Sequence, residues 1–416
     1  MSLCSQRGAV ILSLFMSIAS HSAAGAAPPA RPDPAALKAI HQLLRESPLI
    51  DGHNDLPWHY RKRGNDLNAL DLAGDTRKLT PPLDTDIPRL RAGGMGGQFW
   101  AVYVPPEPSG PPAVQTMFEQ IDLVHRMVAH YPETFGLALT AADLERIHRQ
   151  GRIAALIGVE GGHAINNSLA VLRMAYARGA RYLTLTHVKN TDWADAAGDQ
   201  PQHHGLTSFG KEVVREMNRL GMLVDLSHVT DETMRDALEV SQAPVIFSHS
   251  SVRALCHSPR NVPDDVLKLT ARNGGVVMVC FLPGYLTERG RAALEAAEAE
   301  KARLRKLYGE GSARYQKARA EWRRRHPAAH EASLADVADH IDHVRQVAGI
   351  DHVGIGSDFE GFDGAPEGLE DVSCYPALLA ELLRRGYDRE DLKKVAGANL
   401  LRVFREAEKV SARLKR

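Results

Sequence analysis

Polar residues of a few types follow short apolar runs along this chain of 416 residues. The first such run, PLI, leads directly into Asp51, His53 and Asp55. In an extended segment residues i and i+2 point to the same side, so His53 and Asp55 would face one spot. For this pair alone, a solvated polar strand end is the simpler alternative, and the rest of the sequence decides between the two.

The same arrangement recurs at the ends of later apolar runs. Three of these runs end in histidine, as LTLTH, VDLSH and VIFSH, and others end in a carboxylate. One such histidine is explained by packing, but a series of them is not. We therefore predict a functional cluster formed by the residues at the run ends, which are His53, Asp55, Glu160, His187, His228, His249 and Asp358.

Apolar runs alternate with helical patterns from residue 48 to about residue 400. Near-continuous Val/Ile/Leu strands between amphipathic helices indicate α/β architecture with a parallel sheet covered by helices. Eight units favour a closed (β/α)8 barrel of the TIM type over an open doubly wound sheet, and the strand ends would then converge on one face. The expected strands are 48–53, 96–104, 153–162, 180–187, 221–228, 243–249, 274–281 and 352–359.

The residue types in the cluster suit a metal site. Imidazoles and carboxylates without clustered cysteines bind divalent ions, zinc above all in an exported hydrolase. Two close ions need a bridging carboxylate, and Glu160 is the natural bridge because its strand lies between those carrying the other ligands. Asp358 on the last strand would lie beside the first strand after closure, where it would hold the bridging water and transfer its proton.

Composition and the two chain ends suggest an exported globular protein. The formal net charge is zero, so we expect no nucleic-acid partner. Arg7, the apolar stretch 9–19 and the small residues 22–27 predict a signal peptide over residues 1–26, with an uncleaved anchor as the alternative. The chain ends in SARLKR without an apolar tail. We therefore expect the protein to be periplasmic or secreted and to have no stable membrane anchor.

The remaining chain divides into three parts. Residues 27–47 form a lead-in and first helix, and residues 48–416 form one catalytic domain. Residues 288–330 are rich in Ala, Glu, Arg and Lys and predict a solvated helical hairpin inserted after the seventh strand, with a turn at GEGS. A lid or a dimer contact is the functional alternative for this insertion.

Most of the polar residues of the cluster lie within longer sequence motifs. In order, they include DGHNDLPW, IGVEGGH, RYLTLTH, NRLGMLVDLSHV, APVIFSHSS, RNVPDDVL and GIGSDFEG. Together they resemble the zinc-dependent membrane (renal-type) dipeptidases, peptidase family M19, over roughly residues 40 to 405. The resemblance implies a homodimeric zinc metallo-dipeptidase that hydrolyses dipeptides and tolerates a D-residue at their C-terminal side.

The resemblance also implies two Zn²⁺ ions per chain and a role for each residue of the cluster. His53 and Asp55 would bind the first zinc, His228 and His249 the second, and Glu160 would bridge them.

Three further residues would act on the substrate. The resemblance implies that His187 stabilises the tetrahedral oxyanion and that Arg260 in RNVP binds the C-terminal carboxylate. Asp358 would lie near the bridging water and the free amine of the dipeptide.

The sequence also departs from the family and leaves alternatives. Cys280 stands where we expect asparagine, and a disulfide between Cys256 and Cys280 stays open. One alternative function is a related amidohydrolase acting on N-acyl amino acids or a β-lactam ring. Another is a metal-carrying binding protein without catalysis. Arg260 separates the dipeptidase from the related amidohydrolase: Arg260→Ala should slow dipeptide cleavage strongly, but should change little for a substrate without a carboxylate.

Overall fold

The computed structural model describes residues 33–326 and 331–416, so the predicted signal peptide lies outside the described residues. All ladder pairs between the strands are parallel. The sheet consists of β1 (Leu49–Asn54), β2 (Met95–Tyr103), β3 (Phe135–Leu137), β4 (Ile153–Glu160), β5 (Ala180–Thr184), β6 (Leu223–Asp225), β7 (Ile246–Phe247), β8 (Val276–Val279) and β9 (Val353–Ile355).

Eight of these strands close into a barrel. The order runs from β2 through β1 and then β9 down to β4, and pairing of β2 with β4 completes the circle. This confirms the predicted (β/α)8 TIM-type fold. The strand β3 is additional: it pairs with the first half of β4, while β5 pairs with the second half. Its three residues are too few for an apolar pattern to reveal them.

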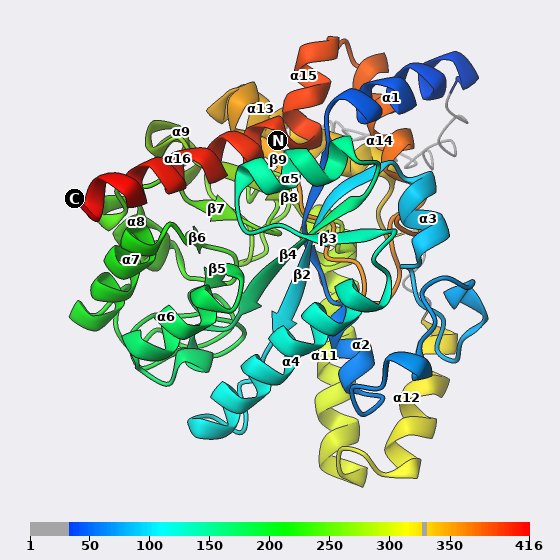
Figure 1. The fold of residues 1–416 in the computed structure, drawn as a ribbon. Helices are drawn as coiled ribbons and strands as arrows, with labels where there is room; N and C mark the ends of the chain where they lie inside the picture. Colours follow the sequence, from blue (N-terminus) through cyan, green and yellow to red (C-terminus); the bar gives the residue numbers. More distant parts are fainter. Residues whose placement is uncertain (1–32, 327–330) are drawn as a thin grey trace, which may run out of the picture.

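Helices lie around the barrel, across one end of it and in a projecting hairpin (Figure 1). They are α1 (Pro34–Glu46), α2 (Leu56–Arg61), α3 (Ile87–Ala92), α4 (Pro111–His130), α5 (Ala141–Arg149), α6 (Leu169–Ala177), α7 (Ser208–Leu220), α8 (Asp231–Val240), α9 (Asp264–Asn273), α10 (Pro283–Leu286), α11 (Glu288–Tyr308), α12 (Ala313–Arg325), α13 (Leu334–Ala348), α14 (Tyr375–Arg384), α15 (Arg389–Lys393) and α16 (Asn399–Leu414).

The inside of the barrel is a packed core, closed at one end by α16. Inward-facing side chains such as Phe99, Leu156 and Met278 belong to the same buried cluster as Leu400 and Phe404 of α16. The helix α16 lies across the upper end of the barrel in Figure 1, where the strands begin. The opposite end, where the strands finish and α2 starts, is left for the polar residues.

Several strands end earlier than their apolar runs predict, and for three of them, β6, β7 and β9, the structure shows why. At these points a side-chain carboxylate takes the place of the neighbouring strand as hydrogen-bond acceptor. The backbone N–H groups of Ser227 and Ser248 donate to Asp225, and that of Ser357 donates to Asp51. The ladders of β6, β7 and β9 therefore stop where the polar end of the barrel begins.

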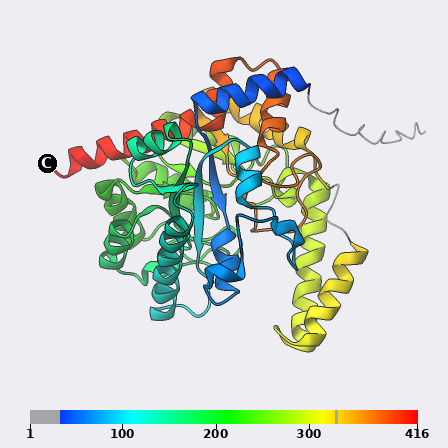
Figure 2. The same cartoon turned by 45° about the vertical axis from the view of Figure 1, so that its right-hand side comes forward.

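The helices α11 and α12 form a hairpin that projects from the barrel (Figure 2). Leu304 and Tyr315 are its buried side chains, at 2% relative exposure each. Thr287 and Ser312 accept hydrogen bonds from backbone N–H groups at the starts of the two helices. Among the described residues, no helix is both long and apolar enough to cross a membrane.

Candidate metal centre

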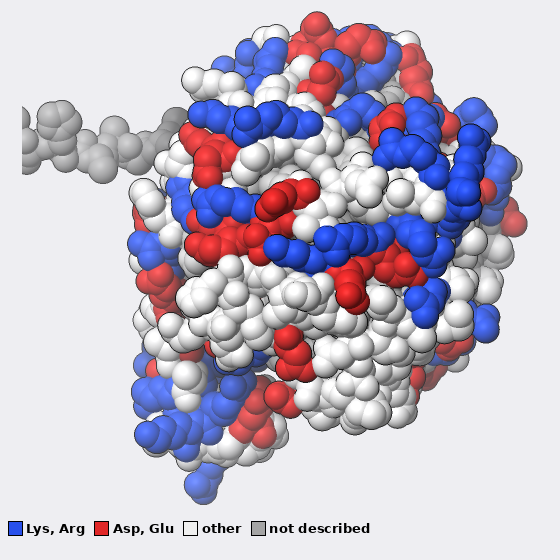
Figure 3. All heavy atoms as spheres, turned by 90° about the vertical axis from the view of Figure 1, so that its left-hand side faces the viewer, with Lys and Arg blue, Asp and Glu red and all other residues white. Residues whose placement is uncertain are grey.

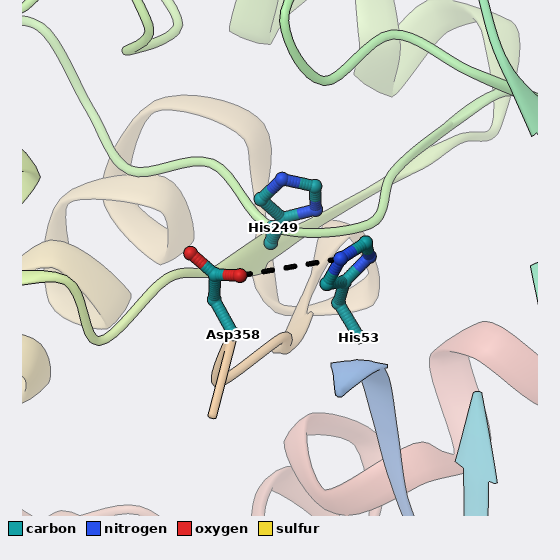
Figure 4. A group of neighbouring side chains, drawn as sticks. All are labelled: His53, His249 and Asp358. Carbon is teal, nitrogen blue, oxygen red and sulfur yellow. Dashed lines mark ion pairs between the residues drawn. The ribbon is translucent and has the colours of Figure 1, made fainter. Parts of the chain in front are cut away.

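The seven residues predicted from the strand ends meet at the carboxyl end of the barrel. His53, on β1, faces three carboxylates. Its Nε2 atom lies 3.4 Å from Asp55 Oδ2, 3.7 Å from Glu160 Oε2 and 4.0 Å from Asp358 Oδ1. Figure 4 shows His53 and Asp358 pointing toward one another beside the ring of His249. Strands from both ends of the chain therefore supply this half of the cluster.

Glu160 connects this half to a second group of histidines. Its other oxygen, Oε1, lies 3.0 Å from His228 Nε2, 3.5 Å from His249 Nε2 and 3.8 Å from His187 Nε2. The Nε2 atoms of His228 and His249 are 2.8 Å apart. The two oxygens of one carboxylate thus face different sets of ligand atoms.

The geometry fits bound metal. The ligand atoms of His53, Asp55 and Glu160 lie within 4.8 Å of one another, as do those of Glu160, His228 and His249. Glu160 belongs to both groups. His53 Nε2 is buried and has no hydrogen-bond partner, so an ion between the carboxylates would satisfy it. The donor set of imidazole nitrogen and carboxylate oxygen contains no thiolate and suits zinc.

Burial and neighbouring charges shift the pKa values of several residues in the cluster. Burial lowers the pKa of His53, but the negative charges of Glu160 and Asp55 outweigh it and raise that pKa to about 10. Burial also raises the pKa of Glu160 to about 8 and that of Asp358 to about 7. A buried group of carboxylates is unfavourable without positive charge beside it, and a cation supplies that charge.

The backbone around the cluster is held in unusual conformations. His228 has φ of 72° and Asp358 has φ of 66°, in the left-handed region that non-glycine residues rarely occupy. At Gly361 a Cβ atom would lie 2.5 Å from both Asp358 Oδ1 and Asp55 Oδ2. Only glycine lets the chain pass this close to the carboxylates, and such strain is typical of functional sites.

Two of the histidine rings are oriented by hydrogen bonds to their Nδ1 atoms. The Ser248 hydroxyl donates its proton to Asp225 Oδ2 at 2.6 Å and lies 2.8 Å from His249 Nδ1. Tyr182 OH donates to Gly52 O and lies 2.8 Å from His53 Nδ1. Each hydroxyl has one proton, so Nδ1–H is the donor in both contacts. Nε2 is therefore the nitrogen of each ring that faces the cluster.

We name two buried hydrogen-bond groups after their central acids. The Asp225 clamp comprises Asp225 with its donors Ser227 N–H, Ser248 N–H and O–H, and Thr184 O–H. The Asp51 clamp comprises Asp51 with its donors His53 N–H, Ser357 N–H and O–H, and Tyr375 O–H. All the acceptor oxygens of both acids are therefore occupied below the cluster.

The predicted substrate residues border the cluster. Arg260 is 6% exposed, and its guanidinium donates to Ser250 Oγ and His249 O, both at 3.2 Å. Its Cζ atom lies 5.1 Å from the centre of the Tyr285 ring. Burial, followed by the positive charge of Arg260, lowers the pKa of His187 to about 3. The ring of His187 is therefore neutral.

Comparison with known proteins identifies the family. A family model described as membrane dipeptidase, peptidase family M19, matches residues 37–416. The chain belongs to the M19 membrane dipeptidase family. It is 43% identical over 385 residues to Dipeptidase 3 of Mus musculus, covering 91% of this chain and 68% of that protein. The family is one of metallopeptidases, so this M19 member is a hydrolase of the dipeptidase class.

Solved structures show the same fold. The probable dipeptidase PvdM of Pseudomonas aeruginosa is 27% identical, with a TM-score of 0.74 over 90% of this chain and 99% of that one. A metallopeptidase of Rhodobacter sphaeroides, liganded with a phosphinate mimic of the dipeptide L-Ala-D-Ala, is 26% identical. Its TM-score is 0.71 over 87% of this chain and 99% of that one.

Sequence reasoning missed most of the residues that orient the predicted ligands of this M19 site. Asp225 and Ser248 stand inside the motifs VDLSH and VIFSH, but nothing in the motifs separates them from ordinary strand residues. Tyr182 gave no signal, because it lies 129 positions from His53. The three cysteines in the described residues, Cys256, Cys280 and Cys374, are free, and Cys280 Sγ lies 3.7 Å from Asp358 Oδ2.

Proposed function

We propose that this M19 member is an exported, binuclear zinc dipeptidase. The observation that carries the proposal is the position of Glu160. Its Oε2 faces His53 at 3.7 Å and its Oε1 faces His228 at 3.0 Å, as a carboxylate shared by two ions would. The nitrogen and oxygen donors around it suit zinc.

Each neighbouring residue has a chemical role in such a site. Zinc held by His53, Asp55, Glu160, His228 and His249 would lower the pKa of bound water toward neutral and would polarise the peptide carbonyl. The Arg260 guanidinium binds the substrate carboxylate through paired, charge-assisted hydrogen bonds. His187, held neutral, donates from Nε2 to the oxyanion. Asp358 takes up a proton at its carboxylate and returns it to the leaving amine.

The same arrangement supports a preference for dipeptides. A site that fixes a free carboxylate at Arg260 and a free amine near Asp358 accepts two residues and excludes longer peptides. The phosphinate ligand of the Rhodobacter sphaeroides relative mimics L-Ala-D-Ala. This likeness supports our further proposal that the C-terminal residue of the substrate can be a D-amino acid.

The proposal is tested by metal content and substrate range together. We expect about two zinc ions per chain in the wild type and one or fewer in Glu160→Gln, because one of the two shared oxygens becomes an amide NH2 and the negative charge is lost. With zinc supplied, the wild type should hydrolyse L,L- and L,D-dipeptides, and a chelator should abolish this activity. The measurements are elemental analysis after gel filtration and a coupled amino-acid assay.

The matched control is His163→Gln. His163 follows Glu160 by three positions, but its Nε2 contacts Pro105 O at 2.9 Å, outside the metal cluster. This variant should keep both ions. Two undiminished ions in Glu160→Gln would refute the shared carboxylate, and faster turnover of N-acyl amino acids or a β-lactam than of any dipeptide would favour the related amidohydrolase function.

A further inference from the structure

The hairpin of α11 and α12 concentrates positive charge in a chain whose formal net charge is zero. The helix α12 has six basic residues and one acidic residue in its 13 positions. Arg314, Lys317 and Arg324 lie at helical spacing, are exposed, and make no ion pair within the described residues. Figure 3 shows Lys and Arg gathered on the lobe at its lower left, which is this hairpin. The surface is therefore available to an anionic partner.

The tip of the same hairpin presents apolar side chains to solvent. Leu307 and Tyr308, the last residues of α11, are 56% and 42% exposed. The turn that follows is open, because a Cβ atom at Gly309 or Gly311 would meet nothing within 4 Å. Nothing in the described chain packs over this end, so the two side chains extend beyond the basic surface.

The hairpin is held in place rather than frayed. Leu304 of α11 and Tyr315 of α12 are buried. At its base, the Thr287 hydroxyl donates to Glu331 O at 2.6 Å, and on its side Arg323 forms an ion pair with Asp363. The apolar tip and the basic face therefore keep a fixed relation to each other and to the barrel.

We propose that this hairpin docks the enzyme on a lipid bilayer with anionic head groups. Leu307 and Tyr308 enter the interfacial layer, while Arg314, Lys317 and Arg324 contact the head groups. A soluble polyanion would satisfy the basic residues but would leave the apolar tip in water. A bilayer offers negative charge and an apolar layer beneath it, and so matches both features.

Docking through the hairpin would place the polar end of the barrel near the bilayer. The hairpin projects from the end of the barrel where the strands finish, which is the end that holds the metal cluster (Figures 1 and 2). Asp363, which pairs with Arg323, lies five positions after Asp358. The bilayer would hold the mouth of the site near its surface. This inference does not depend on which substrate the site cleaves.

The charge requirement is tested with Arg314→Gln/Lys317→Gln/Arg324→Gln in the full chain. Binding is measured by co-sedimentation with vesicles of phosphatidylcholine, with and without one third phosphatidylglycerol. We expect the wild type to bind only the anionic vesicles, and the triple variant to bind them roughly a hundredfold more weakly, since each basic residue contributes about fivefold. High salt should release the wild type.

The matched control is Lys38→Gln/Arg215→Gln/Lys268→Gln, which removes equal charge from exposed positions on α1, α7 and α9. It should bind like the wild type. Equal weakening by both triple variants, or equal binding of the wild type to neutral vesicles, would overturn the proposal. Hydrolysis of a soluble dipeptide should be unchanged in both, which shows that they are folded.

The apolar requirement is tested with Leu307→Ser/Tyr308→Ser. Loss of two interfacial side chains should weaken binding to the anionic vesicles about tenfold. The control, Met174→Ser/Leu383→Ser, changes two exposed apolar residues elsewhere and should have no effect. If the tip variant binds vesicles like the wild type, or if soluble polyphosphate binds the hairpin as tightly as the vesicles do, the partner is a polyanion and not a bilayer.

Discussion

The Asp51 clamp and the Asp225 clamp both hold the backbone beneath the metal cluster, but only the Asp225 clamp also contacts a histidine ring. Each acid accepts from an N–H two positions later, and from both the N–H and O–H of a serine just after the end of the neighbouring strand. Each also accepts a further hydroxyl, from Tyr375 or Thr184. The difference is that Ser248 of the Asp225 clamp also contacts the Nδ1 atom of a predicted ligand, His249.

Near β1, one residue supports the backbone of His53 and a different residue orients its ring. Asp51 holds the backbone of His53, but the ring of His53 is oriented by Tyr182, which reaches it from β5. At Gly158 a Cβ atom would lie 1.9 Å from Tyr182 Cζ, so this glycine makes room for the ring. Backbone support and ring orientation are joined in the Asp225 clamp and divided between two residues near β1.

The largest effect is expected from Asp225→Asn. An amide offers one acceptor oxygen and two donor hydrogens to four donors, so several buried groups lose their partner. We expect zinc affinity to fall about a hundredfold and the free energy of unfolding to fall by about 3 kcal/mol. Zinc affinity is measured by competition with a chromogenic chelator, and stability by urea unfolding of the metal-free protein.

Asp51→Asn is the matched comparison. It should lose a similar free energy of unfolding, because its hydrogen bonds are of the same number and kind. Zinc affinity should fall only about tenfold, since the ring of His53 keeps its contact with Tyr182. Equal losses of zinc affinity in the two variants would show that the clamps act only as backbone supports.

An intermediate effect is expected from Ser248→Ala. His249 loses the acceptor for its Nδ1–H, and zinc affinity should fall roughly thirtyfold. Ser357→Ala removes the equivalent hydroxyl from the Asp51 clamp, where no ring depends on it. That variant should lose about 1 kcal/mol of stability and keep its zinc affinity within about twofold. Isothermal titration of both metal-free variants with zinc compares them, and a reversed order would contradict the relay through Ser248.

Of the variants that remove a contact to a histidine ring, Tyr182→Phe is expected to have the smallest effect. The ring still fills the space over Gly158, but His53 Nδ1 loses its oxygen partner, and zinc affinity should fall about tenfold. Tyr375→Phe removes a phenol from the Asp51 clamp and should lower the free energy of unfolding by about 1 kcal/mol with little change in zinc affinity. Cobalt substitution gives a second readout, because the d–d spectrum should change in Tyr182→Phe alone.

Much of this site was predictable because its residues occupy equivalent places in a repeating pattern. Glu160, His228 and His249 each follow an apolar run, and the closed barrel brings all such strand ends to one face. What could not be predicted is the support beneath them. The contact of Tyr182 with His53 crosses the barrel interior, and no local pattern in the sequence encodes such a pair.

The sequence by itself determined the alternation of strands and helices, the types of the ligands and the charge of the insertion. These follow from local spacing and composition, which need no knowledge of distant partners. The tertiary structure alone decided that Glu160 turns its two oxygens to different ligand groups, that Asp225 reaches His249 through Ser248, and that the hairpin projects beside the metal cluster. Those features depend on barrel closure, which places β9 against β1 and β2 against β4.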